Sequence, residues 1–265
     1  MMRTKLIAVD MDGTFLRSDN TYDKARFKEI YSKLKEKDIR FTVASGNQYF
    51  QLKDFFPEYS DIIYVSENGA LIRDNNHIYS LHAYPDEAVN KIEQFLDKQD
   101  RLQFLVCGAQ SAYEPKKFGQ DYYNRMYVYY HHLKQINNFD EINDQIVKFA
   151  VQCNDEDTQY FIDLFKKELA PYADVTSSGH GDIDIIQPGI HKANGLKELG
   201  NILNISLNEM AAFGDGNNDL EMIREVGDGV AVENASSDVL KAAKHITGTN
   251  NRQGVLTYIE KNILQ

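Results

Sequence analysis

Two carboxylate-rich segments at opposite ends of the chain could do chemistry together. Segment 10–14 reads Asp-Met-Asp-Gly-Thr, and segment 214–219 reads Gly-Asp-Gly-Asn-Asn-Asp. Their four carboxylates are those of Asp10, Asp12, Asp215 and Asp219. Carboxylates packed closely without a cation raise one another's pKa values and cannot all stay charged. A hard divalent cation resolves this conflict, and an all-oxygen set short of a full cage favours Mg2+.

A calcium loop and a turn without function are the alternatives for either segment alone. An EF-hand loop needs Gly at its sixth position and Glu at its twelfth. Phe15 and Thr21 occupy these positions in the first segment, and Leu220 and Val226 occupy them in the second. Both segments therefore fail as EF-hands. Because each segment also follows an apolar run, a shared site is the better interpretation.

The elements that must position these loops follow an alternating pattern. Short apolar runs predict strands, and apolar residues at helical spacing predict the helices between them. Strands are expected at 5–9, 41–44, 62–65, 210–213 and 229–232, and helices at 23–38, 48–56, 192–203, 218–226, 237–244 and 255–264. This order predicts an α/β fold with a parallel sheet. Loops at the carboxyl ends of such strands form the ligand crevice, which brings segment 45–47 to the carboxylates.

The middle of the chain predicts a second α/β domain inserted into the first. Helices are expected at 85–99, 122–130 and 155–169, strands at 102–107 and 147–151, and an antiparallel edge strand at 182–186. Residues 1–82 and 188–265 then form the main domain, and residues 83–187 form the insertion.

Composition excludes several classes of function. The 265 residues carry a formal net charge of −11 without a basic stripe, so the chain is not expected to bind nucleic acid. The two cysteines, Cys107 and Cys153, lack CxxC spacing and fit free thiols in a reducing cytosol. No secretory pattern and no apolar run of bilayer length is present. We expect a cytoplasmic monomer without membrane partners.

The sequence resembles the haloacid dehalogenase (HAD) superfamily, in its Cof-type subfamily IIB, and within it bacterial sugar phosphatases. The resemblance rests on both carboxylate segments, on Ser45 and Lys192 between them, and on segments 67–70 (Glu-Asn-Gly-Ala) and 189–195. It implies a Rossmann-like parallel-sheet core with an inserted α/β cap domain of the C2 type. It also implies a Mg2+-dependent phosphatase that acts on small hexose or pentose phosphates through an aspartyl-phosphate.

Carried over residue by residue, the resemblance implies a role for each motif. Asp10 is the nucleophile, and Asp12 is the general acid and base. Asp10, Asp12 (through its backbone carbonyl), Asp215 and Asp219 hold the metal. Contacts to the phosphate or substrate are implied for Met11, Thr14, Ser45, Gly46, Asn47, Lys192 and Asn218.

Single residues among these have other interpretations. Lys192 alone would be a solvated helix residue, and Ser45 or Asn218 could cap the helix that follows it. The pattern also departs from the family at Asn47, where many members carry Arg. A neutral amide can hydrogen-bond to a phosphate or a sugar hydroxyl but supplies no charge, which weakens the case for doubly charged substrates.

The insertion is expected to close over the crevice, exclude water and select the substrate. Candidate selecting segments are 108–114 and 177–184, the latter with His180, Asp184 and two glycines that allow close approach. The Tyr-rich run 122–130 is interpreted as a packing face.

Three other functions stay open on the sequence. A phosphomutase would use the same aspartyl-phosphate, and a phosphatase of a vitamin or nucleotide precursor would use the same core. A non-catalytic sensor with Asp10 as a phosphorylation switch is disfavoured by Asp12, which would promote hydrolysis of that phosphate.

Overall fold

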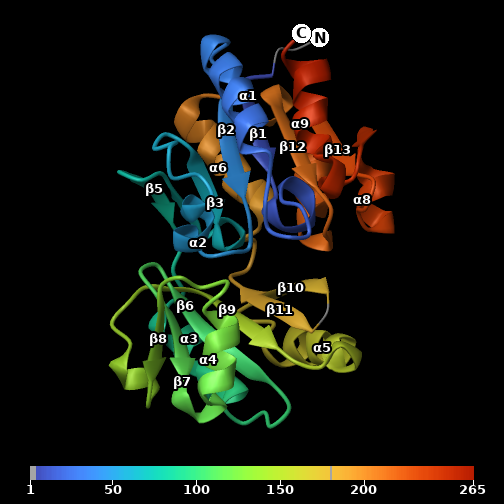
Figure 1. The fold of residues 1–265 in the computed structure, drawn as a ribbon. Helices are drawn as coiled ribbons and strands as arrows, with labels where there is room; N and C mark the ends of the chain where they lie inside the picture. The colour runs from blue at the N-terminus through green and yellow to red at the C-terminus, as the bar shows by residue number, and fades with distance from the viewer. Residues whose placement is uncertain (1–3, 180) are drawn as a thin grey trace.

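A mostly parallel sheet forms the centre of the larger part of the molecule (Figure 1). The computed structural model describes residues 4–179 and 181–265. Sheet A has the strand order β14-β13-β12-β1-β2-β3-β4-β5, in which β4 pairs antiparallel with both of its neighbours, β3 and β5. Its strands are β1 (Leu6–Val9), β2 (Arg40–Ala44), β3 (Ile63–Ser66), β4 (Leu71–Arg73), β5 (Ile78–Leu81), β12 (Met210–Gly214), β13 (Asp228–Val232) and β14 (His245–Thr247).

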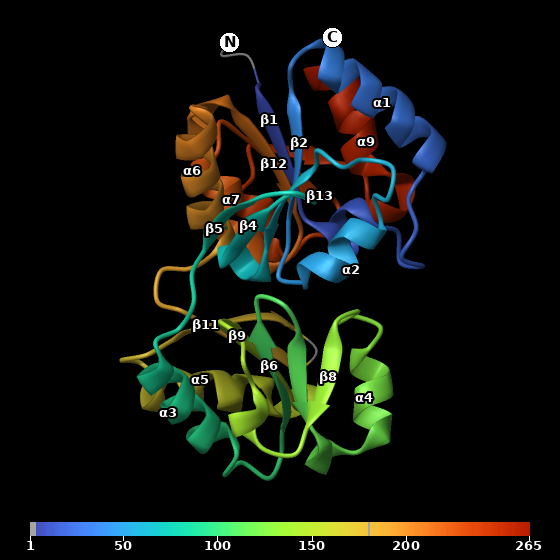
Figure 2. The ribbon, with the colours of Figure 1, turned by 90° about the vertical axis from the view of Figure 1, so that its left-hand side faces the viewer.

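Helices cover both faces of sheet A, as Figure 2 shows. On one side lie α1 (Lys24–Glu36) and α9 (Gly254–Tyr258), and on the other lie α6 (Lys192–Leu203) and α7 (Leu220–Glu225). The remaining helices of this part are α2 (Tyr49–Asp54) and α8 (Ser237–Ala242). Because both faces are covered, β1 is buried throughout as a continuous apolar run, as expected of an interior parallel strand.

A second sheet with its own core is formed by the middle of the chain. Sheet B has the order β10-β11-β9-β6-β7-β8 and is antiparallel except for the pair β7 and β8. Its strands are β6 (Gln103–Gly108), β7 (Ala112–Pro115), β8 (Leu133–Ile136), β9 (Ile146–Gln152), β10 (Asp174–Gly179) and β11 (Asp182–Ile186). Helices α3 (Asp86–Leu96) and α5 (Thr158–Glu168) share one apolar cluster with it, and α4 (Gln120–Met126) contributes to another.

The predicted α/β class, parallel main sheet and second sheet are confirmed. Helix α6 has the predicted bounds, but the helix predicted at 122–130 ends at Met126. The prediction of an edge strand at 182–186 is wrong, because β11 lies between β10 and β9. Six short strands (β4, β5, β7, β8, β10 and β14) were not predicted. The domain boundaries at 82/83 and 187/188 stay a prediction, although the strands of sheet B all lie between residues 103 and 186.

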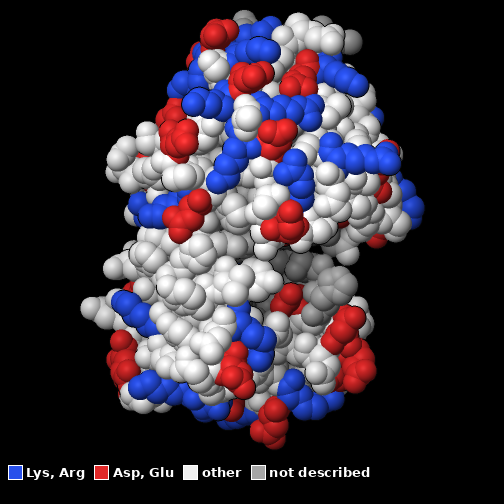
Figure 3. All heavy atoms as spheres, viewed as in Figure 1, with Lys and Arg blue, Asp and Glu red and all other residues white. Residues whose placement is uncertain are grey.

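Charges of both signs are interspersed over the face seen in Figure 3, which has no basic stripe. Within the described part of the chain, no helix is both long and apolar enough to cross a bilayer.

A close contact between α6 and the Glu67–Gly69 turn sets the position of α6. A Cβ atom on Gly195 would lie 2.6 Å from Cγ1 of Val65 and 3.0 Å from Cα of Gly69. We expect Gly195→Ala to lower the free energy of unfolding by about 1–3 kcal/mol through overpacking. Urea denaturation measures this change. Asn201→Ala, at an exposed position of the same helix, is the control and should stay within about 0.5 kcal/mol of wild type. Equal effects of the two substitutions would contradict the close contact.

Candidate active site

The two carboxylate loops meet because their strands are neighbours in sheet A. β1 pairs with β12, and Val9 lies opposite Phe213 in this pair. Asp10 directly follows β1, and Asp215 directly follows β12. Because the two strands are parallel neighbours, both residues emerge at the same edge of the sheet. Loops at the carboxyl edge of a parallel sheet form its ligand crevice. The two motifs therefore converge at one edge of the sheet, as predicted.

Lys192 joins these loops from the first turn of α6. Its side chain is 1% exposed, and its Nζ atom donates to Oδ1 of Asp10 at 2.6 Å and to Oδ1 of Asp219 at 2.7 Å. These two carboxylates raise the pKa of Lys192 despite its burial, so the ammonium stays charged. The lysine thus fixes the carboxylate of Asp10 from behind the crevice.

Asp215 is oriented by three neighbours. Thr14 donates its hydroxyl to Oδ1 of Asp215 at 2.5 Å, and Oδ2 of Asp219 accepts the backbone N–H of Asp215 at 2.9 Å. Gly13 has a φ of +75°, and a Cβ atom there would lie 2.5 Å from Oδ2 of Asp215. Glycine at position 13 therefore allows both the backbone conformation and the approach of the carboxylate.

Asp10, Asp215 and Asp219 together fit a divalent cation. Each offers an oxygen, and these oxygens lie within 4.8 Å of one another. Three carboxylates and one ammonium leave a negative excess that one divalent cation would balance. Burial and the neighbouring carboxylates raise the pKa of Asp10, and burial raises the pKa of Asp215 to about 6. Carboxylate oxygens in a set short of a full cage suit Mg2+.

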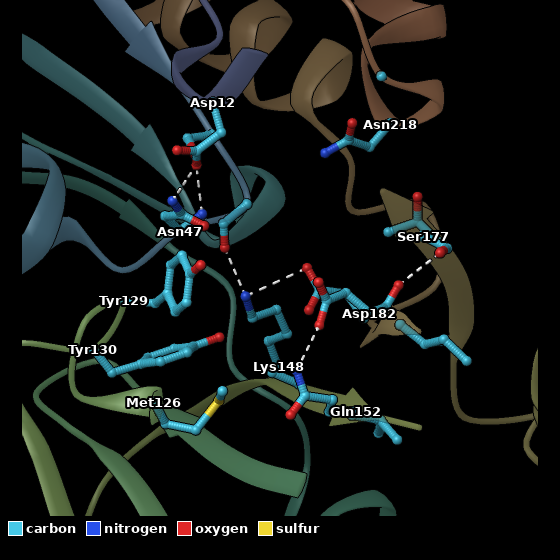
Figure 4. Close-up of a pocket in the computed structure, with 18 of the residues that line it drawn as sticks. Asp12, Asn47, Met126, Tyr129, Tyr130, Lys148, Gln152, Ser177, Asp182 and Asn218 are labelled. Atoms are coloured by element: carbon cyan, nitrogen blue, oxygen red, sulfur yellow. Dashed lines mark hydrogen bonds and ion pairs between the residues drawn. The ribbon is translucent and has the colours of Figure 1, made fainter. Parts of the chain in front are cut away.

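A cavity of about 460 Å3 lies in front of these carboxylates, between the two sheets (Figure 4). From the main sheet it is lined by Asp10, Asp12, Asn20, Ser45, Gly46, Asn47, Asp215, Gly216 and Asn218. From the middle of the chain come side chains of α4, of the segment after it, and of strands β9, β10 and β11. The cavity therefore has a reactive side and a side built by the inserted segment.

Asp12 lies on the reactive side of the cavity and, unlike Asp10 and Asp219, is exposed. Oδ2 of Asp12 accepts a hydrogen bond from Nδ2 of Asn47 at 2.7 Å. Desolvation raises the pKa of Asp12, and the bond from Asn47 and the charge of Lys192 oppose this rise. A carboxyl with a raised pKa that faces the cavity is suited to proton transfer.

Several residues that were predicted to contact the substrate or the metal lie behind the cavity rather than on its wall. Met11 and Thr14 are fully buried, and Lys192 and Asp219 have at most 1% of their surface exposed. Among the described residues, none of these four lines the cavity. Their side chains orient the carboxylates or pack in the core. Ser45, Gly46, Asn47 and Asn218 do line it, as expected of contact residues.

The two candidate selecting segments differ in position. Of segment 177–184, residues 177–179 end β10 and residues 182–184 begin β11, and Ser177, Asp182 and Asp184 line the cavity. His180 lies outside the described residues. No residue of segment 108–114 lines the cavity within the described chain.

The structure corrects the interpretation of the Tyr-rich run and adds a residue that sequence reasoning missed. Tyr122, Met126 and Tyr130 pack in a buried cluster, but they also line the cavity together with the half-exposed Tyr129. A packing face was therefore an incomplete interpretation. Lys148 was missed, although a single charge inside the apolar run 146–151 was a usable signal.

The comparison with protein families gives one match over nearly the whole chain. The family model of the haloacid dehalogenase-like hydrolases matches residues 7–259. A 5-amino-6-(5-phospho-D-ribitylamino)uracil phosphatase of Escherichia coli K12 is 40% identical over 262 residues, which cover 98% of this chain and 96% of that protein.

Solved structures agree with this match. A crystal structure of a protein from Streptococcus mutans UA159 has a TM-score of 0.93 and 32% identity, and covers 99% of this chain and 100% of that one. A sugar phosphatase of HAD subclass IIB has a TM-score of 0.83 at 19% identity, with 99% and 100% covered. This second likeness bears on the fold alone.

Binding of Mg2+ to the three carboxylates should be visible without any substrate. At saturating Mg2+ we expect the midpoint of thermal unfolding to rise by about 5 °C or more at pH 7.5, because a cation that binds only the folded state stabilises it. Below pH 6 the shift should shrink, since the pKa of about 6 makes Asp215 protonated there and the proton competes with the cation. Differential scanning fluorimetry with Mg2+ and with EDTA measures both effects.

The matched variants are Asp215→Asn and Asp238→Asn. The first should abolish the shift, and the second should keep it, because Asp238 is an exposed carboxylate on α8. A full shift in Asp215→Asn would contradict the assignment of the site.

Proposed function

Because the chain belongs to the haloacid dehalogenase-like hydrolases, we propose that it is a Mg2+-dependent phosphatase of small phosphate monoesters with Asp10 as nucleophile. The observation that carries this proposal is the position of Asp10. Its carboxylate is held by buried Lys192 at 2.6 Å and faces a cavity of about 460 Å3. A fixed carboxylate nucleophile divides the hydrolysis into two displacements.

In the first displacement, Asp10 attacks phosphorus and the bond to the leaving oxygen breaks. Asp12 gives its proton to that oxygen, so the product leaves as an alcohol. In the second displacement, water attacks the phosphorus of the aspartyl-phosphate, and Asp12 takes the proton of this water. Inorganic phosphate and the free Asp10 carboxylate result. Mg2+, held by Asp10, Asp215, Asp219 and the backbone carbonyl of Asp12, would balance charge on the phosphoryl oxygens.

The charge of the cavity favours a substrate whose organic part is neutral. Among the described lining residues, Lys148 is the one cationic side chain, against the carboxylates of Asp10, Asp12, Asp182, Asp184 and Asp215. A second anionic group on the substrate would be repelled there. Hydroxyl groups of the substrate would donate hydrogen bonds to the carboxylates of Asp182 and Asp184. Hexose and pentose phosphates meet this description, and we propose them as substrates.

A second candidate substrate is a phosphorylated polyol that carries a planar ring. Figure 4 shows Met126, Tyr129 and Tyr130 along one wall and Gln152, Ser177 and Asp182 along another. Aromatic side chains stack on planar heterocycles, and amides and carboxylates accept or donate hydrogen bonds at ring edges. The relative from E. coli, named for a ribitylaminouracil phosphate, supports this second candidate.

Loss of the nucleophile should abolish the reaction. We expect Asp10→Asn to lower phosphate release by at least about a thousandfold, because an amide cannot form the acyl phosphate. The assay measures phosphate released from hexose phosphates, pentose phosphates, nucleotides, the ribitylaminouracil phosphate and p-nitrophenyl phosphate, with Mg2+ and with EDTA.

The control for this assay is Asp61→Asn. It removes a partly exposed carboxylate that pairs with Lys35 and should leave the rate within about twofold of wild type. The proposal is refuted if the wild-type protein releases phosphate from none of these compounds. It is also refuted if the Asp10→Asn variant is active.

Substitution of Tyr129 should distinguish the two candidate substrates, because only one of them has a planar ring that can stack on this side chain. If the ring of the substrate lies on this side chain, Tyr129→Ala lowers kcat/KM for the ribitylaminouracil phosphate by about tenfold, the usual order for one lost stacking contact. The rate with glucose 6-phosphate should change little. Tyr127→Ala is the matched control, since Tyr127 is similarly exposed but does not line this cavity. Equal losses on both substrates would speak against stacking.

A further inference from the structure

A buried lysine connects the inserted segment to the loop that carries Asn47. Lys148 lies on β9 and is 1% exposed, and its Nζ atom donates to the backbone carbonyl of Gly46 at 2.6 Å. The same Nζ lies 3.0 Å from Oε2 of Glu67 and 3.4 Å from Oδ2 of Asp184. The contact crosses from sheet B to the reactive edge of sheet A (Figure 4).

The backbone carbonyls of segment 45–47 show why this contact matters. The two outer carbonyls, of Ser45 and Asn47, accept backbone N–H groups of the Glu67–Gly69 turn at 3.1 and 3.2 Å. The middle carbonyl, of Gly46, accepts the ammonium of Lys148. Two of these three carbonyl contacts therefore come from the main sheet, and the third comes from the inserted segment.

The turn that supplies the two backbone donors is itself tied to the inserted segment. Glu67 and Asn68 have φ values of 51° and 56°, which are uncommon for residues with a side chain. Such conformations persist where the surroundings hold them, and they gather at functional sites. Nδ2 of Asn68 donates to Oδ2 of Asp184 at 2.6 Å, and Glu67 pairs with Lys148.

From this loop the connection continues to the proposed general acid. The residue after Gly46 is Asn47, whose Nδ2 donates to Oδ2 of Asp12 at 2.7 Å. One peptide unit and one side chain therefore separate the Lys148 contact from Asp12. A general acid acts only within hydrogen-bond reach of the leaving oxygen, and a small displacement costs much of its effect.

Docking of the two sheets alone would not require a buried charge. Gln48 exchanges two neutral hydrogen bonds of 3.0 Å with the backbone of His132 across the same interface. A buried ammonium pays a desolvation penalty that its partners must offset. If the inserted segment moved away, Lys148 and Glu67 would regain water, which would offset the loss of their contact and allow it to form and break reversibly.

We propose that Lys148 is a positioning residue that couples closure of the inserted segment to the placement of Asp12, through Gly46 and Asn47. This inference rests on the proposed function, in which Asp12 protonates the leaving oxygen. It assigns to Lys148 no contact with the reacting atoms.

The test uses a series of substituted phenyl phosphates of nearly equal size. p-Nitrophenolate leaves well without a proton, whereas unsubstituted phenolate depends more on the general acid. In Lys148→Met we expect kcat/KM for phenyl phosphate to fall by about 10- to 100-fold, part of the 10²- to 10⁴-fold that general acid catalysis supplies. For p-nitrophenyl phosphate the fall should stay below about threefold. The dependence of log kcat/KM on leaving-group pKa should thus become steeper than in wild type.

Four further variants sharpen the test. Lys117→Met removes an exposed lysine that pairs with Asp97 and should keep the wild-type slope. Asn47→Ala should give the steep slope, and adding Lys148→Met to it should change the slope no further, since both act on one path. If Lys148→Met does not fold, the double variant Lys148→Met with Glu67→Gln removes both buried charges together and serves in its place.

The outcomes separate the inference from the proposed function. A steeper slope in Lys148→Met and in Asn47→Ala, not additive between them, supports the coupling. Equal losses across the series, or a slope like that of wild type, would overturn it and leave Lys148 a structural residue. A wild-type protein that hydrolyses none of these phosphates under Mg2+ would instead refute the proposed function.

Discussion

The ion pairs of the buried Lys192 are the interaction on which the site depends. Its ammonium contacts Asp10 at 2.6 Å and Asp219 at 2.7 Å, and these residues come from β1 and from the loop after β12. A buried charge without partners is strongly unfavourable, so α6, β1 and this loop are stabilised mainly in the arrangement that keeps all three groups together. The close packing of Gly195 on the Glu67–Gly69 turn serves the same arrangement, because it sets how deeply α6 approaches the sheet.

In strands β9 and β11, side chains alternate between the apolar core of the inserted segment and the polar wall of the cavity. Successive side chains of a strand point to opposite faces of its sheet. Phe149 and Ile185 share an apolar cluster with α3 and α5, while Lys148 and Asp184 face the cavity. The same strands thus bury the core of the inserted segment and build the polar wall of the site. A shift of one residue in their register would exchange these two sets, so packing of the apolar face fixes the polar one.

Much of this arrangement was predictable from the sequence, and the exceptions have physical causes. Long amphipathic segments such as 192–203 and apolar runs such as 210–213 gave elements of the right type. Strands of three or four residues such as β4 and β14 carry too short a pattern to recognise. Strand β10 was missed because its segment, Asp-Val-Thr-Ser-Ser-Gly at 174–179, has a single large apolar residue, and without it β11 was taken as an edge strand. The contacts of Lys148 could not be predicted, because its partners Gly46 and Glu67 are far from it in sequence.

The net charge of the chain supports the proposal that the site holds a cation. With a net charge of −11, the protein as a whole repels phosphate, so attraction must be local. Lys192 and Lys148 are the cations nearest the chemistry in the described structure, and both are already engaged by carboxylates. Asn47 has a neutral amide and adds no charge. In the proposed function, the positive charge that a phosphoryl group requires comes from a cation supplied from outside the chain, and the carboxylates of Asp10, Asp215 and Asp219 would hold it.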